Sequence, residues 1–149
     1  MSRWITLTVD HLKAAGHGAI IDRARTAATG GIDPVDQAIV KVTARVRRAV
    51  APGNVLDADA AKIPGSLEDV AVLLAIATLA GRIPLPLTND MRDAVTAARK
   101  ELEQLAENKT KVELADNPES QESFAETGMK ITEVNVPRRL TGRERTGGL

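Results

Sequence analysis

The chain has no cysteine and no tyrosine, and it contains a single tryptophan, Trp4, and a single phenylalanine, Phe124. The absence of cysteine excludes disulfide bonds, thiolate zinc sites and cysteine nucleophiles. Because 43% of the residues are hydrophobic but only 1% are aromatic, any core has to be built from Ala, Val, Leu and Ile. This composition favours closely packed helices over a β-sandwich.

The chain also lacks a net charge, because 20 basic side chains balance 20 acidic ones. This balance gives no global attraction to nucleic acid or to an acidic membrane, so any charge-dependent role has to be local. The first residues lack the basic region and the long apolar region of a signal peptide. Together with the absence of cysteine, this predicts a protein that resides in a cytoplasm.

The longest apolar run in the chain covers residues 70–80 and contains a single polar side chain, Thr78. It ends too soon to span a membrane, which needs about 20 apolar residues. We predict a central helix over about 66–80, with Ser66 and Asp69 as a capping box and Gly81 as a left-handed C-terminal cap. Because the run is apolar nearly all round, other helices should cover most of its sides.

Four further helices are expected from apolar residues at helical spacing and from residues that cap helices. Thr8 can cap the first of them, and Asp33 followed by Pro34 is the clearest helix start in the chain. The expected ranges are about 9–15, 18–28, 34–51 and 89–107. The predicted fold class is therefore all-α, a small helical bundle around the buried central helix.

The chain changes in character after these helices. A short strand is expected at 111–114, and the residues that follow are acidic and without periodicity, which is typical of a linker. We predict a helical core domain at 1–107, a short strand and acidic linker at 108–128, and an extended basic C-terminal arm at 129–149. The arm alternates apolar and polar side chains in strand-like segments. An isolated strand is unstable in water, so the arm is expected to order by pairing with a partner.

The sequence shows no motif of an enzyme. No serine lies in a Gly-x-Ser-x-Gly turn, and His11 and His17 have no acidic partner at metal-ligand spacing. Residues 57–68 superficially resemble a calcium loop, but Lys62 stands where such a loop needs glycine. We therefore expect no catalytic site, no metal site and no cofactor.

One cluster of basic residues lies at helical spacing. Lys41, Arg45 and Arg48 are four and three residues apart and share one helix face, with Arg47 next to them. This face is either the solvated side of an amphipathic helix or a contact surface for DNA phosphates or for a partner subunit. The neutral overall charge and the scarcity of aromatic residues argue against sequence-specific nucleic-acid recognition.

The order and local texture of these segments resemble the small head-completion proteins, also called head-tail connector or adaptor proteins, of Mu-like tailed bacteriophages. The resemblance covers nearly the whole chain. It rests on Thr-Val-Asp-His-Leu at 8–12, Ala-Arg-Val-Arg-Arg-Ala-Val-Ala-Pro at 44–52, the central helix, Met-Arg-Asp-Ala-Val at 91–95, Glu-Leu-Glu-Gln-Leu-Ala at 101–106, the short element at 112–114 and Pro-Arg-Arg-Leu-Thr-Gly-Arg at 137–143.

The resemblance implies a structural virion protein of the capsid-tail neck, assembled in the cytoplasm of a bacterial host. Its helical protomers would form a ring, commonly a dodecamer, beneath the portal, and packaged DNA would pass through the lumen without sequence-specific binding. The implied partners are further copies of the chain, the portal protein and a tail-side stopper or tail-terminator protein, with no membrane contact. The residues expected to bind the portal are Met129, Ile131, Val134, Val136, Arg138, Arg139, Leu140, Arg143 and Arg145.

Two other functions are open at the level of sequence. A small helical DNA-binding or regulatory module would use the face of Lys41, Arg45 and Arg48 to contact phosphate groups. The chain could instead be a stopper or tail-terminator protein, although those proteins are usually rich in β-strands.

Overall fold

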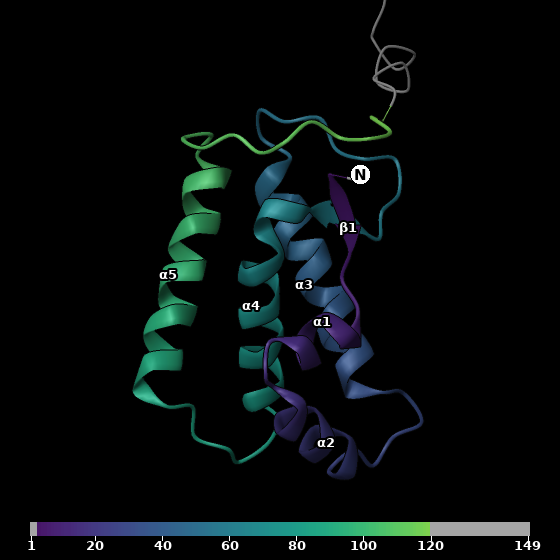
Figure 1. Ribbon diagram of the computed structural model, residues 1–149, viewed down its shortest axis with the longest axis vertical. Helices are drawn as coiled ribbons and strands as arrows, with labels where there is room; N and C mark the ends of the chain where they lie inside the picture. The colour runs from purple at the N-terminus through teal and green to yellow at the C-terminus, as the bar shows by residue number, and fades with distance from the viewer. Residues whose placement is uncertain (1–2, 120–149) are drawn as a thin grey trace, which may run out of the picture.

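The computed structural model describes residues 3–119, and five helices and a small antiparallel sheet pack together in this range (Figure 1). The elements, in chain order, are β1 (Trp4–Thr6), α1 (Val9–Ala14), α2 (Gly18–Thr26), α3 (Pro34–Val50), β2 (Lys62–Pro64), the short 3-10 helix η1 (Gly65–Leu67), α4 (Glu68–Ala80) and α5 (Asn89–Ala106). The structure confirms the predicted helical bundle. It adds a two-stranded sheet that the sequence did not predict.

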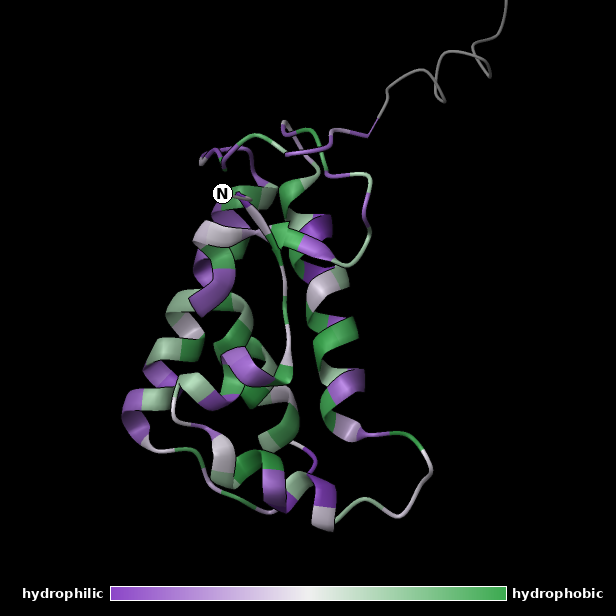
Figure 2. Ribbon diagram, turned by 45° about the vertical axis from the view of Figure 1, so that its right-hand side comes forward, coloured by the Kyte–Doolittle hydropathy of each residue, from purple (hydrophilic) through white to green (hydrophobic). Residues whose placement is uncertain are grey.

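The predicted central helix is α4, and α2, α3 and α5 all pack against it. Eight of its 13 residues are buried, which confirms that other elements cover it on most sides. The neighbouring helices α3 and α5 are amphipathic, and Figure 2 shows hydrophobic and hydrophilic residues recurring along the outer helices. One stripe of each therefore faces the core while the other faces solvent.

Both caps predicted for α4 are wrong. Ser66 lies in η1, where its hydroxyl group donates a hydrogen bond of 2.6 Å to Glu113 Oε2 instead of capping the helix. The N-cap position is taken by Leu67, which makes no side-chain hydrogen bond, and Gly81 has a right-handed conformation with φ −69°. The acidic residues in the first turn of α4 place negative charge beside the positive end of the helix dipole, which favours this start without a capping side chain.

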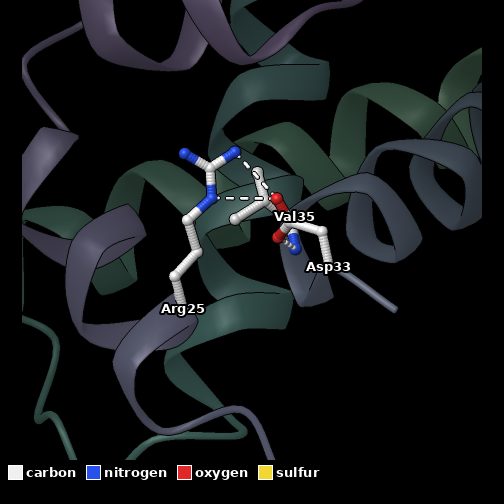
Figure 3. A network of polar contacts seen from close by, with 3 residues as sticks. All are labelled: Arg25, Asp33 and Val35. Atoms are coloured by element: carbon white, nitrogen blue, oxygen red, sulfur yellow. Dashed lines mark hydrogen bonds and ion pairs between the residues drawn. The ribbon is translucent and has the colours of Figure 1, made fainter. Parts of the chain in front are cut away.

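The start of α3 follows the prediction. Asp33 is the N-cap residue, and its Oδ1 accepts a hydrogen bond of 2.9 Å from the backbone N–H of Val35 (Figure 3). Its Oδ2 accepts a hydrogen bond of 2.8 Å from Arg25 Nε, which joins the end of α2 to the start of α3. The hydrogen bond from Arg25, and after it the one from Val35, lowers the pKa of the Asp33 carboxyl group.

The small sheet closes one end of the core. β1 pairs antiparallel with β2, with Ile5 opposite Ile63 and Trp4 opposite Pro64. Trp4 and Ile63 are buried almost completely, with exposed fractions of 1% and 0%. Three residues are too few for a period of two to show in the sequence, and the strands are far apart along the chain.

Residues 107–119, which we call the strap, cross the end of the bundle at which α5 finishes (Figure 1). The strand predicted at 111–114 is wrong, because no strand forms there. Hydrogen bonds hold the strap on the core, so the predicted linker at 108–128 begins with a segment that belongs to the folded unit. The rest of that linker and the arm at 129–149 lie outside the described residues.

Two residues of the strap, Glu113 and Asp116, bind the N-terminal strand. The indole N–H of Trp4 donates a hydrogen bond of 3.2 Å to the carbonyl oxygen of Glu113. The backbone N–H groups of Arg3 and Trp4 both donate to Asp116 Oδ2, at 2.8 and 3.0 Å. The carboxylate of Glu113 also accepts a hydrogen bond of 2.8 Å from the backbone N–H of Ser66. Strap, sheet and η1 are thus fastened to one another.

The second half of the strap binds the loop after α3 through the buried Asp57. Its Oδ1 accepts a hydrogen bond of 2.9 Å from the N–H of Asp59, and its Oδ2 accepts one of 3.0 Å from the N–H of Asn117. These backbone hydrogen bonds lower the pKa of the Asp57 carboxyl group. Ala58 N donates a further bond of 2.8 Å to the carbonyl oxygen of Asn117. Asp57 therefore organises the loop and the strap together.

We expect the free energy of unfolding to fall once the pH drops below about 4.5. The pKa of Asp57 is lowered from 3.8 by backbone hydrogen bonds. Burial raises the pKa of Glu113, but hydrogen bonds from the Ser66 hydroxyl and backbone N–H outweigh it, so the net pKa lies below 4.5. As the pH falls below this value, the unfolded chain binds more protons than the folded chain. The stabilisation from the two carboxylates is therefore present above this value and is lost as the pH falls through their pKa values in the folded protein.

Urea unfolding between pH 7 and pH 3, followed by the fluorescence of Trp4, measures this dependence. The indole group of Trp4 is bound to the strap, so its emission should report strap release together with unfolding. In the Glu113→Gln variant the acid dependence should be shallower, because one of the titrating groups is gone. An identical pH dependence in that variant would contradict the role of Glu113.

Candidate interaction surface

Two of the predicted basic residues, Arg45 and Arg48, line a shallow cleft between α3 and α5. Arg99 and Glu103 line it from α5. The remaining lining residues are apolar: Ala49, Leu102 and Ala106. We call this site the arginine cleft. It has a volume of about 260 Å³ and combines three cationic side chains with an apolar floor.

The third predicted basic residue, Lys41, is exposed on α3 but does not line the arginine cleft. Sequence reasoning in turn missed Arg99, which lies on a different helix. Its place beside Arg45 and Arg48 depends on the packing of α3 against α5, and spacing within one helix carries no signal for that. The basic site is thus built from two helices, not from one helix face.

The arginines of the cleft have no ionic partner within the described part of the chain. The ion pairs there are Arg25 with Asp33 and Lys109 with Glu107. Unpaired guanidinium groups at an exposed cleft are available to an anionic partner, with which they can form two parallel hydrogen bonds.

Arg47, the neighbour of these residues in the sequence, serves the core instead. Its Nη2 donates a hydrogen bond of 2.8 Å to the carbonyl oxygen of Asp57. Its Nη1 donates to the carbonyl oxygens of Asp59 and Lys62, at 2.9 and 2.8 Å. The guanidinium carbon lies 5.9 Å from the centre of the Trp4 ring, at the distance of a cation–π contact. Arg47 therefore holds the loop after α3 against β1 and β2.

Exposed apolar residues lie elsewhere on the surface. Two shallow pockets of about 370 and 400 Å³ adjoin the end of α2 and the turn after α4, and Ile83 lines both. Ile32, beside the first pocket, is 66% exposed, and Val40 on α3 is 67% exposed. Clusters of exposed apolar surface often mark contacts between proteins.

His11 and Asp57, two of the residues considered for metal binding, have structural partners. The N–H of Thr8 donates a hydrogen bond of 3.1 Å to His11 Nδ1 at the start of α1, which makes His11 part of the helix cap. Asp57 binds backbone N–H groups, as described above. Within residues 3–119, no three His, Asp or Glu side chains gather in a way that could hold a metal ion.

The residues predicted to bind the portal, between positions 129 and 145, lie outside the residues that the structure describes. Their proposed contact therefore stays a prediction. None of the described helices is long and apolar enough to cross a membrane.

No family model, curated protein or solved structure matches this chain. Inferences about its function therefore rest on its own residues and their arrangement.

Proposed function

We propose that the protein is a structural subunit of a bacteriophage neck, a head-tail adaptor whose copies form a ring beneath the portal and link the capsid to the tail. The observation that carries the proposal is the strap. It binds the core as far as Glu119, and residues 120–149 follow it in the sequence. A helical unit that anchors the chain upstream of an arm that alternates apolar and polar residues and then becomes basic suits a subunit that uses this arm to attach to another protein.

The surface of the core supports self-association. Ile32 and Val40 expose apolar side chains, and the arginine cleft offers cationic groups that have no ionic partner among residues 3–119. These features suit contacts between neighbouring copies in a ring. A ring would also multiply a weak contact of each arm, because all copies would bind the portal at once.

The roles of the titratable groups favour a structural function. The carboxyl groups with lowered pKa values are those of Asp33, Asp57 and Glu113. Each is explained by a helix cap or by the strap. These carboxylates already have partners that stabilise the fold, so they are not positioned as reactive groups.

Deletion of residues 129–149 is expected to abolish portal binding and to leave a folded, helical protein. The reason is that the contacts described for the core and the strap lie within residues 3–119. Circular dichroism measures the helix content. Negative-stain imaging of the protein, alone and mixed with the portal protein encoded nearby in the same genome, shows rings and portal complexes.

Deletion of residues 146–149 is the matched control, because it removes none of the predicted portal-binding residues. Portal binding that survives the longer deletion would contradict the role of the arm. A full-length chain that forms neither rings nor a portal complex would contradict the adaptor function itself.

The arginine cleft supports one alternative, a small DNA-binding or regulatory module. Three guanidinium groups that have no ionic partner in the described part of the chain also suit phosphate groups. Binding to duplex DNA that weakens steeply with salt, and that Arg45→Glu with Arg48→Glu abolishes, would favour this module. Absence of binding at low salt would reject it.

A further inference from the structure

The arginine cleft has two properties that an occupant must match. Its rim carries Arg45, Arg48 and Arg99, none of which has an ionic partner within the described residues. Its floor is apolar and includes the side chain of Leu102, which is 4% exposed. An occupant that satisfies both properties carries several negative charges and one apolar side chain. A short acidic peptide with an aromatic residue has this chemistry.

The chain contains one such segment. Residues 119–126 read Glu-Ser-Gln-Glu-Ser-Phe-Ala-Glu, with three carboxylates and the only phenylalanine of the protein. No basic residue lies between Lys111 and Lys130. The segment is therefore complementary to the arginine cleft in both charge and polarity.

We propose that the arginine cleft binds segment 119–126 of a neighbouring copy of the chain. Phe124 packs on the apolar floor, and the glutamates pair with the arginines on the rim. This inference rests on the self-association that the proposed function requires. It also assigns a role to the acidic stretch, which the portal-binding arm does not include.

The position of Glu119 favours a neighbouring copy over the same copy. Its backbone N–H donates a hydrogen bond of 2.8 Å to the carbonyl oxygen of Leu56, so the strap ends at the loop after α3. In Figure 1 this end lies on the side of the bundle away from α5, which forms one wall of the cleft. Phe124 lies five residues after Glu119, and this stretch spans at most about 18 Å when fully extended, so only a short stretch of chain is available to turn back toward the cleft of the same copy.

The lining of the cleft favours a peptide over nucleic acid. Glu103 is part of the lining and repels carboxylates as well as phosphates, but the backbone N–H and serine hydroxyl groups of segment 119–126 can donate hydrogen bonds to it, whereas a phosphate diester has no donor. The apolar floor has no counterpart in a phosphate backbone. DNA binding is a competing outcome of the test.

A photo-crosslinking experiment on the full-length chain tests the proposal. Phe124 is replaced by the photoreactive analogue p-benzoylphenylalanine, and isotopically light and heavy copies are mixed before irradiation. Mass spectrometry then identifies the crosslinked peptides. We expect crosslinks that join light and heavy copies and that end within 45–49 or 99–106. The same probe at Leu114, which is 72% exposed on the strap, is the control and should not label the cleft.

Charge reversal supplies the second measurement. Arg45→Glu with Arg48→Glu should weaken self-association on the order of 100-fold, because like charges would then face each other. Adding Glu122→Arg and Glu126→Arg to the same chain should restore both association and the crosslink. Lys100→Glu is the matched control, because Lys100 is exposed on α5 but does not line the cleft.

Three results would overturn the proposal: crosslinks only within one copy, crosslinks to another surface, or a crosslink that charge reversal leaves unchanged. If charge reversal abolishes DNA binding but not the crosslink, the cleft is a phosphate site. Rings that survive charge reversal with the crosslink unchanged would reject this inference and keep the adaptor function. Crosslinks between light and heavy copies at the cleft, in a protein that forms neither rings nor a portal complex, would support this inference and reject the adaptor function.

Discussion

The Leu74→Ala variant is expected to lose about 2–5 kcal/mol of unfolding free energy. Leu74 is 3% exposed and lies in α4, the helix against which α2, α3 and α5 pack. Removing its isobutyl group takes away apolar contacts and leaves a cavity that surrounding helices can fill only in part. Urea unfolding, followed by the helical circular dichroism signal, measures the loss.

Leu73→Ala is the matched control, because Leu73 is the next residue in the same helix and is only partly buried. Its truncation should cost clearly less than that of Leu74. Both leucines belong to the same apolar run of the sequence, and the run alone does not distinguish them. Equal losses in the two variants would mean that α4 is rotated relative to the core described here.

The Arg47→Ala variant is expected to lose about 3 kcal/mol of unfolding free energy. The guanidinium group donates to three backbone carbonyl groups, and hydrogen bonds from a charged donor contribute about 1.5–3 kcal/mol each, although they do not add fully. Without Arg47 these carbonyl oxygens have to find water in a partly buried loop. The emission of Trp4 should also change, because its ring loses the cation that lies over it.

Two variants separate this role from a general effect of charge. Arg48→Ala removes the same charge at an exposed neighbouring position and should stay within about 0.5 kcal/mol of the native protein. Arg47→Lys keeps the charge but loses the planar fork that reaches several acceptors, so it should recover only part of the stability. An Arg47→Ala variant with the same free energy of unfolding as the native protein would contradict the structural role of Arg47.

The contrast between these two arginines shows the limit of sequence reasoning for the candidate site. Both are basic residues in the last turns of one predicted helix. Helical spacing places Arg48 on the face of Lys41 and Arg45, with Arg47 beside that face, but it does not show what either side chain contacts. Arg47 faces the loop and the Trp4 ring, whereas Arg48 faces the cleft that α5 helps to form. Their roles depend on segments distant in the sequence, which local spacing does not place.

The long helices α3 and α5 were predictable because each repeats its apolar positions over several turns. Asp33 and Thr88 also mark helix starts through side chains that bind the first backbone N–H groups. The two strands and the strap lack such signals. They are short, and long-range hydrogen bonds such as those of Asp116 and Asp57 fix them. The strap has the polar, aperiodic composition of a linker, so its sequence did not predict that it binds the core.

The strap has a mechanical consequence for any partner that pulls on the C-terminal end of the chain. Tension would enter at Glu119 and first load its bond to Leu56, then the bonds of Asn117 to the loop after α3. Only after these had opened would the force reach Asp116 and Glu113, and then α5. The contacts would yield one after another, as local opening at low cost. The helical bundle would thus be shielded from the first part of any strain.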